Sequence, residues 1–380
     1  MPSLKNLRHV QIYSDPQNFC AEVAVVSLPN GELVAVFARN RGLQHTDTGD
    51  ILLARSRDNG RTWDPDPVVV FPAAEDHGYA LAGLSLLSDG RLVANAYGYE
   101  FLVDGRIDFQ AGSSCFQNVF LAWSGDGGHT WSERQKVNIA PMRTAAVRDG
   151  IAELPDGTLL MPLCGLQERR GNPELAELES WTAFVLGSMD GGKHWIYWGT
   201  MGHDPVGVRS YWEPGLVRLP DGRLLGMLRT LQWPNQDPPG GYLYMTISED
   251  EGASWSNPRK TGLWGYPANL ITLRDGRVLC TYGRRREPMG IRICVSEDGA
   301  TWDPANEIVI REYDVSTVAQ GGQKRSSEER VLTKRPEWLP YRHIGYPTSV
   351  QLDNGEILSA YHLFDAQGRQ YIECAIYQLA

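Results

Sequence analysis

Ionisable and aromatic side chains recur at two places beside an apolar motif that this chain repeats. Carboxylates and tyrosines can transfer protons or act as nucleophiles, and arginines form charge-assisted hydrogen bonds to anionic or polar groups. The residues that precede a copy of the motif are Glu22, His77, Tyr211, Glu213, Tyr266 and Tyr346. Those that follow a copy are Arg39, Arg41, Asp47, Arg229, Arg284 and Arg285. Their chemistry depends on whether the fold brings them together.

The repeated motif is an apolar stretch, a Leu-x-Asp-Gly turn or a close variant, and a second apolar stretch. Six copies occur, at residues 24–37, 83–97, 150–163, 215–228, 269–282 and 349–361. A tight hairpin turn needs positive φ, which Gly and Asn adopt at low cost. Each copy therefore predicts a β-hairpin.

A second motif, with Ser, Asp and Trp at fixed places, follows five of the six hairpins. Its copies are SRDNGRTW (56–63), SGDGGHTW (124–131), SMDGGKHW (188–195), SEDEGASW (248–255) and SEDGATW (296–302). Each indicates a turn between a third and a fourth strand. Four antiparallel strands repeated six times predict an all-β, six-bladed β-propeller formed by residues 1–380 as one domain.

The sixth repeat lacks the second motif, so its outer strand must come from elsewhere. We expect residues 9–14, near the N-terminus, to supply it, because closing the ring in this way removes exposed strand edges. The polar segment from about 303 to 340 is expected to be an insertion between blades five and six. Because antiparallel strands alternate in direction, both kinds of turn lie on one face, and the polar residues listed above lie on the opposite face.

The two motifs together resemble the Asp-box (BNR) repeats of the sialidase, or neuraminidase, superfamily, and the resemblance covers nearly the whole chain. The Asp-box residues themselves are expected to be structural. The resemblance implies a hydrolase of terminal sugars in which Tyr346 is the nucleophile, Glu213 its partner carboxylate and Asp47 the acid/base; sialidases use such a tyrosine. It also implies substrate binding by Arg229 and by the arginines at 284–286, with Arg41 in support.

One position departs from that family pattern. The family opens its first blade with Arg-Ile-Pro, whose Arg grips a substrate carboxylate, whereas this chain has Cys20-Ala21-Glu22-Val23. Arg39, Arg41 or Arg148 would have to compensate. Sialic acid, another acidic sugar and a different terminal sugar therefore stay open as substrates, with Tyr211, Tyr266 and His77 expected to line the site.

Two other functions also stay open. A polysaccharide lyase would remove a proton beside a uronate, using residues such as His77, Tyr79, Tyr211 and Tyr266. A non-catalytic carbohydrate-binding propeller would bind sugar without turnover, since a fold alone does not fix an activity.

The composition of the chain limits the kinds of partner that it can bind. The formal net charge of −10 argues against nucleic acid, and no apolar run reaches the roughly 18 residues that a membrane span needs. The N-terminal residues do not resemble a signal peptide, so we expect a cytoplasmic protein. No metal-ligand spacing and no phosphate-binding loop is evident, so neither metal nor cofactor is expected. Assembly into a homo-oligomer stays open.

Overall fold

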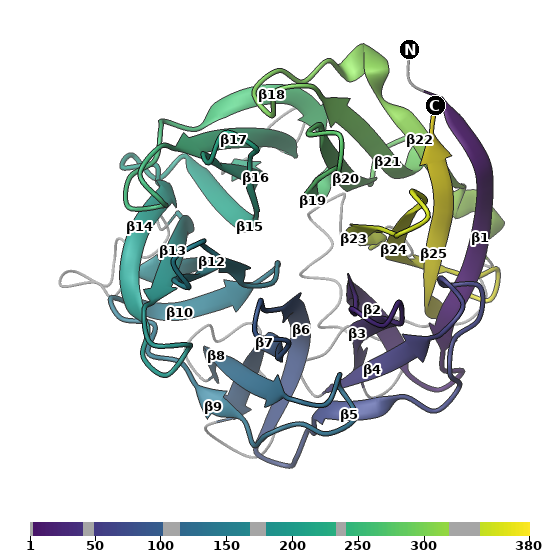
Figure 1. Ribbon diagram of the computed structural model, residues 1–380, viewed down its shortest axis with the longest axis horizontal. Helices are drawn as coiled ribbons and strands as arrows, with labels where there is room; N and C mark the ends of the chain where they lie inside the picture. Colours follow the sequence, from purple (N-terminus) through teal and green to yellow (C-terminus); the bar gives the residue numbers. More distant parts are fainter. Residues whose placement is uncertain (1–2, 41–48, 102–114, 168–179, 233–240, 319–342) are drawn as a thin grey trace.

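Six antiparallel sheets are arranged as blades around a central axis (Figure 1). The computed structural model describes residues 3–40, 49–101, 115–167, 180–232, 241–318 and 343–380. Each blade has four strands in order from the axis to the rim, and blade three has one further short strand. The predicted all-β, six-bladed propeller is confirmed.

The strands of the first three blades follow the chain in order. Blade one contains β2 (Phe19–Ser27), β3 (Leu33–Asn40), β4 (Asp50–Ser56) and β5 (Val68–Phe71). Blade two contains β6 (His77–Leu86), β7 (Leu92–Phe101), β8 (Cys115–Ser124) and β9 (Gln135–Lys136). Blade three contains β10 (Met142–Val147), β11 (Ala152–Glu153), β12 (Leu159–Gln167), β13 (Thr182–Ser188) and β14 (Ile196–Gly202).

The last three blades continue the pattern, and the sixth is completed from the start of the chain. Blade four contains β15 (Arg209–Arg218), β16 (Leu224–Gln232), β17 (Tyr242–Ser248) and β18 (Arg259–Trp264). Blade five contains β19 (Tyr266–Thr272), β20 (Val278–Arg284), β21 (Met289–Ser296) and β22 (Ile308–Tyr313). Blade six contains β23 (Gly345–Gln351), β24 (Ile357–Phe364), β25 (Gln370–Leu379) and β1 (Leu4–Ser14). The expected closure by the N-terminal strand is confirmed: β1 pairs antiparallel with β25.

Part of the segment expected to be an insertion belongs to a blade. Residues 308–313 form β22, the outer strand of blade five. The two helices of the described residues flank it, η2 (Pro304–Asn306) and η3 (Val315–Thr317), and no described helix is long enough to cross a membrane. Residues 319–340 of the expected insertion lie outside the described residues.

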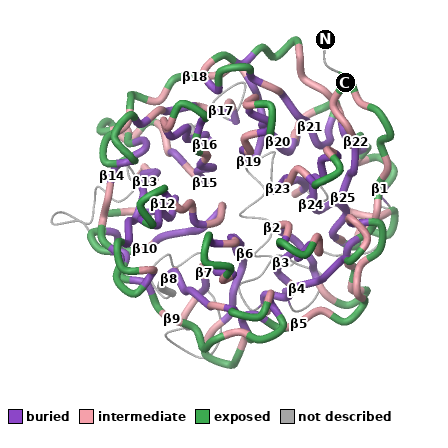
Figure 2. Tube along the Cα trace, in the orientation of Figure 1, coloured by how far each residue is buried: buried purple, intermediate pink, exposed green. Residues whose placement is uncertain are grey.

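The hydrophobic core is divided among the junctions between blades. Six clusters of buried side chains each join two neighbouring blades, and the cluster between blades two and three also includes Tyr346 of blade six. The inner strands consist largely of buried residues (Figure 2). This burial explains the nearly continuous apolar stretches of the repeat.

Each Asp box fixes the turn between the third and fourth strands of its blade. In blade two, Asp126 accepts hydrogen bonds from the backbone N–H groups of His129 (3.0 Å) and Thr130 (2.9 Å) and from the Ser124 hydroxyl (2.7 Å). These bonds lower the pKa of Asp126 below its ordinary value, with the side-chain bond from Thr130 as the largest cause. The carboxylate is committed to the turn, which fits a structural role.

The inner strands are held around the axis by polar side chains that bridge neighbouring blades. The bridging bonds are Ile151 N–H to Ser85 Oγ (2.7 Å), Leu216 N–H to Asp149 Oδ2 (3.3 Å), Ser349 N–H to Asn269 Oδ1 (2.9 Å) and Val25 N–H to Thr348 Oγ1 (3.1 Å). Such bonds satisfy buried backbone groups and fix where each inner strand lies relative to its neighbours.

Candidate active site

All six inner strands carry a β-bulge where the chain enters the blade, and three of these bulges hold a residue with a side chain at positive φ. The bulges in β2, β15 and β23 place Glu22, Glu213 and Tyr346 at φ values of 63°, 46° and 48°. This left-handed conformation costs about 1–2 kcal/mol for a residue with a side chain. Bulges re-aim side chains and are frequent beside active sites. We call this end of the ring the entry face.

The residues after two of the bulges explain why the strands deviate there. Pro214 follows Glu213 and Pro347 follows Tyr346. Proline has no backbone N–H to donate to the neighbouring strand, so it is tolerated where the ladder is interrupted. The sequence therefore favours a bulge at the two positions.

Tyr346 of blade six and Glu213 of blade four, 133 positions apart in sequence, form a direct hydrogen bond in which the Tyr346 hydroxyl donates to Glu213 Oε1. The second oxygen of that carboxylate, Oε2, accepts a hydrogen bond from Arg229 Nη1 at 2.6 Å. All three side chains are buried. The structure thus brings together three of the residues that the sequence singled out, and the carboxylate is shared between a phenol and a guanidinium group.

Two further arginines lie close to this pair. The Arg285 Cζ atom is 5.4 Å from the centroid of the Tyr346 ring and 5.5 Å from that of Tyr266, and Arg148 Cζ is 5.7 Å from the Tyr346 ring. Tyr266 also lies under Arg229, with 4.4 Å between ring centroid and Cζ. Arg285 donates from Nε to the Ile344 carbonyl (2.9 Å), while its buried Nη2 has no hydrogen-bond partner among the described residues.

The surroundings of the pair push the two pKa values apart. Burial raises the pKa of Glu213, but the charge and hydrogen bond of Arg229 outweigh it, so the pKa lies below the ordinary value. Burial also raises the pKa of Tyr346 well above its ordinary value, as do the charges of Glu213 and Glu22, against the opposing charges of Arg229 and Arg285. At rest, Glu213 is ionised and Tyr346 holds its proton.

Glu22 lies on the other side of Tyr346 with two histidines that the predicted site did not include. The Glu22 backbone N–H donates to His362 Nδ1 (2.9 Å), so His362 carries its hydrogen on Nε2, which donates to the His343 carbonyl (3.2 Å). The His362 ring stacks on Tyr346 with centroids 5.6 Å apart, and His343 Nε2 is 4.0 Å from Glu22 Oε1. The signal for Glu22 was its position before the first hairpin, equivalent to those of Glu213 and Tyr346.

Several other predicted residues are directed elsewhere. Arg39 Nη2 donates to Asp50 Oδ2 (2.8 Å) on the neighbouring strand, and Arg284 Nη1 is 3.9 Å from Glu307 Oε1 at the rim of blade five. Tyr211 packs in the core between blades three and four. His77 Nδ1 is hydrogen-bonded to Asp76 Oδ1 (2.6 Å). Arg41 and Asp47 lie outside the described residues, so their roles in the site stay predictions.

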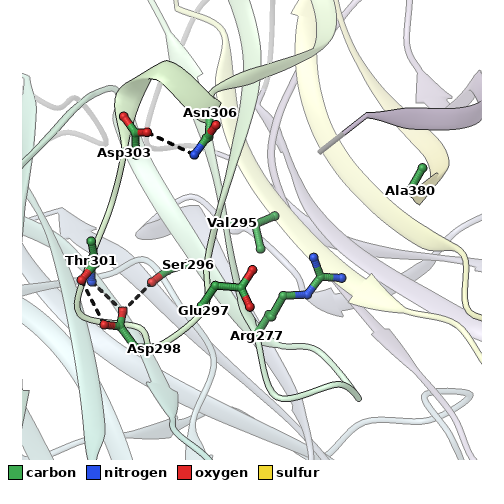
Figure 3. Close-up of a pocket in the computed structure, with 9 residues that line it drawn as sticks. All are labelled: Arg277, Val295, Ser296, Glu297, Asp298, Thr301, Asp303, Asn306 and Ala380. Carbon is green, nitrogen blue, oxygen red and sulfur yellow. Dashed lines mark hydrogen bonds between the residues drawn. The ribbon is translucent and has the colours of Figure 1, made fainter. Parts of the chain in front are cut away.

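A cavity of about 480 Å³ lies away from these residues (Figure 3). Its lining includes Arg277, which precedes β20, whereas Arg285 follows β20; the cavity is therefore at the opposite end of the blade from the Tyr346 site. Asp298, which also lines it, accepts backbone bonds from Ala300 and Thr301 within an Asp box. The cavity is thus separate from the Tyr346–Glu213–Arg229 group at the entry face.

The fold is a six-bladed propeller built from Asp-box repeats. The sequence profile of the BNR repeat-like domain matches residues 101–359, and the chain belongs to this family. A protein of unknown function from Dyadobacter fermentans is 25% identical and superimposes with a TM-score of 0.79, over 98% of this chain and 99% of that one.

More distant solved structures share the fold. A Hadza microbial sialidase is 17% identical with a TM-score of 0.65, covering 95% of this chain and 65% of that chain. The α-L-arabinanase of Penicillium chrysogenum, solved with arabinobiose, is 14% identical with a TM-score of 0.63, covering 98% of each chain. The chain thus shares its fold with both a sialidase and an arabinanase.

Proposed function

We propose that this protein is a retaining exo-glycoside hydrolase in which Tyr346 is the nucleophile and Glu213 its general base. The observation that carries the proposal is the buried hydrogen bond from Tyr346 to Glu213, held from the far side by Arg229. A nucleophile bonded to a base that a third group orients is the arrangement expected for covalent catalysis. The strained bulges at both residues favour a functional origin.

The first step follows from the direction of this hydrogen bond. As the Tyr346 oxygen forms a bond to the anomeric carbon, its proton passes to Glu213 Oε1, and the glycosidic bond breaks with its electrons on the leaving oxygen. That oxygen takes a proton from an acid, a role that we assign to Asp47 because of the family resemblance. The high pKa of Tyr346 opposes early ionisation, so proton transfer must accompany attack.

The second step reverses the first with water in place of the leaving group. Asp47 takes a proton from the water as its oxygen attacks the anomeric carbon, and the Tyr346 oxygen leaves and regains the proton from Glu213. Two displacements retain the configuration of the anomeric carbon. Arg285, whose charge favours the anionic form of Tyr346, stabilises the charge on its oxygen during both steps.

The decisive variant is Tyr346→Phe, assayed on chromogenic glycosides. Removing the nucleophilic oxygen should lower kcat by at least about 10³-fold while the circular dichroism spectrum is retained. Tyr377→Phe is the matched control, because it removes another buried hydroxyl from blade six, one bonded to Ser359 (2.9 Å), and should leave kcat unchanged. Unchanged turnover by Tyr346→Phe, or an unsaturated product that absorbs in the near ultraviolet, would overturn the proposal.

A further inference from the structure

Glu22 is a buried carboxylate of the entry face that the proposed mechanism does not use. It is 2% exposed, lies in a left-handed conformation and is aimed by the same kind of bulge as Glu213 and Tyr346. Blade one neighbours blade six, so Glu22 and Glu213 approach Tyr346 from different sides. A strained, buried carboxylate at this place needs a role.

The surroundings of Glu22 fix its position beside the nucleophile. Its backbone N–H is bonded to His362, whose ring stacks on Tyr346, and the His343 ring stacks on His362 with centroids 5.2 Å apart. The Glu22 charge is close enough to contribute to the raised pKa of Tyr346. A sugar carbon within reach of the Tyr346 oxygen, roughly 3–3.5 Å, would thus have Glu22 as a charged neighbour of the nucleophile.

The arginines around Tyr346 are mostly engaged. Arg229 is paired with Glu213, and Arg148 Nη2 donates to the Pro347 carbonyl. Arg285 keeps a buried Nη2 that no described residue accepts from. On the described residues, a substrate group beside the nucleophile thus has a donor in Arg285 and an acceptor in Glu22.

This donor and acceptor suit a hydroxyl group and not a carboxylate. A hydroxyl can donate to Glu22 and accept from Arg285, whereas an ionised carboxylate only accepts and would meet a like charge in Glu22. We propose that Glu22 is a specificity-determining residue that selects neutral sugars, bearing hydroxyl groups and no carboxylate on the reacting carbon. This inference rests on the proposed glycosidase function.

The experiment compares 4-methylumbelliferyl glycosides, which share one leaving group. The set holds the N-acetylneuraminic acid conjugate, with a carboxylate on the reacting carbon, and neutral pentosides and hexosides in both anomeric forms. We expect kcat/KM for the best neutral glycoside to exceed that for the sialoside at least about 100-fold. This factor corresponds to about 2.7 kcal/mol.

Two variants assign the preference to Glu22. Glu22→Gln keeps the shape but loses the charge, and it should lower kcat/KM for the neutral glycoside about 10-fold or more while raising it for the sialoside. Glu251→Gln, which alters an exposed glutamate also in the left-handed conformation (φ 57°), should change neither value.

The outcomes separate the two proposals. If the native protein has a higher kcat/KM for the sialoside than for any neutral glycoside, and Tyr346→Phe no longer turns the sialoside over, the inference is overturned and the glycosidase function stands. An unchanged substrate preference in Glu22→Gln would remove Glu22 as its cause. Absence of turnover on every glycoside would overturn the proposed function, and the inference with it.

Discussion

The left-handed backbone conformation occurs both in the Asp boxes and in the bulges of the entry face, but different residues occupy it. Directly after the Asp of the five Asp boxes the residues are Asn59, Gly127, Gly191, Glu251 and Gly299, with φ between 57° and 72°. At the bulges they are Glu22, Glu213 and Tyr346, and all three are buried.

At the Asp boxes the fold requires only a backbone conformation, whereas at the bulges it also keeps a particular side chain. At the Asp boxes, which lie at the surface, glycine meets the demand and other residues are tolerated. At the bulges, glycine would relieve strain, yet a large functional group is kept in each case. Strain that is retained with a specific side chain indicates function, whereas strain at an interchangeable position does not.

Among substitutions that test this difference between the two regions, the largest effect on stability is expected at Arg229. In Arg229→Met, Glu213 stays buried without its cation, so the free energy of unfolding should fall by roughly 3–5 kcal/mol. The pKa of Glu213, now governed by burial, should rise, and the acid limb of kcat/KM should move from below pH 4.5 to higher pH. Arg229→Lys keeps the charge and should show a smaller shift; an acid limb at one pH in all three proteins would contradict this assignment.

An intermediate effect is expected from Asp298→Asn in the Asp box of blade five. Hydrogen bonds from the turn hold the pKa of Asp298 at about 2, below its ordinary value, despite opposing burial. Because the pKa is lowered on folding, the stabilisation is complete above about pH 4 and is lost as pH falls through 2. We expect a loss of about 1 kcal/mol in urea unfolding at pH 7, a much smaller loss near pH 2, and unchanged kcat at pH 7.

Asp66→Asn, on an exposed connection, serves as its control and should not change stability at either pH. A loss of kcat in Asp298→Asn at pH 7 without a loss of stability would break the separation between the two regions.

The smallest effect is expected at Glu251. Glu251→Gly relieves the left-handed strain but adds freedom to the unfolded chain, so stability should rise by only about 0.5–1 kcal/mol. Thermal unfolding measures the gain, and turnover should be unchanged. A decrease in stability would show that the Glu251 side chain contributes more than its conformation costs.

Much of the fold was predictable because the repeat is local. Alternating apolar stretches and Asp-Gly turns identify the hairpins, and the missing sixth Asp box points to the N-terminal strand. The outer strand of blade five was not identified, because residues 308–313 carry neither motif. Only its antiparallel pairing with β21, the strand before it in the chain, identifies this segment as an outer strand.

The meeting of Tyr346, Glu213 and Arg229 could be anticipated because each lies directly before or after a copy of the repeat, at the end that faces the axis opening. Their roles stay predictions. Sequence could not show that Arg39 pairs with Asp50, because that choice depends on the side chain opposite it in the sheet. It also could not place His343 and His362 beside Glu22, since blades six and one meet only on ring closure. Whether Asp47 approaches Tyr346 stays a prediction.

The pairing of β1 with β25 sets an order of events during synthesis. Tyr346 stands on the inner strand of the blade that the first and last strands complete together, and Glu213 is two blades away. A nascent chain still lacking β25 has neither a closed circle nor a settled place for this phenol. Any property that depends on the position of Tyr346 is therefore acquired only after β25 has been synthesised and has paired with β1.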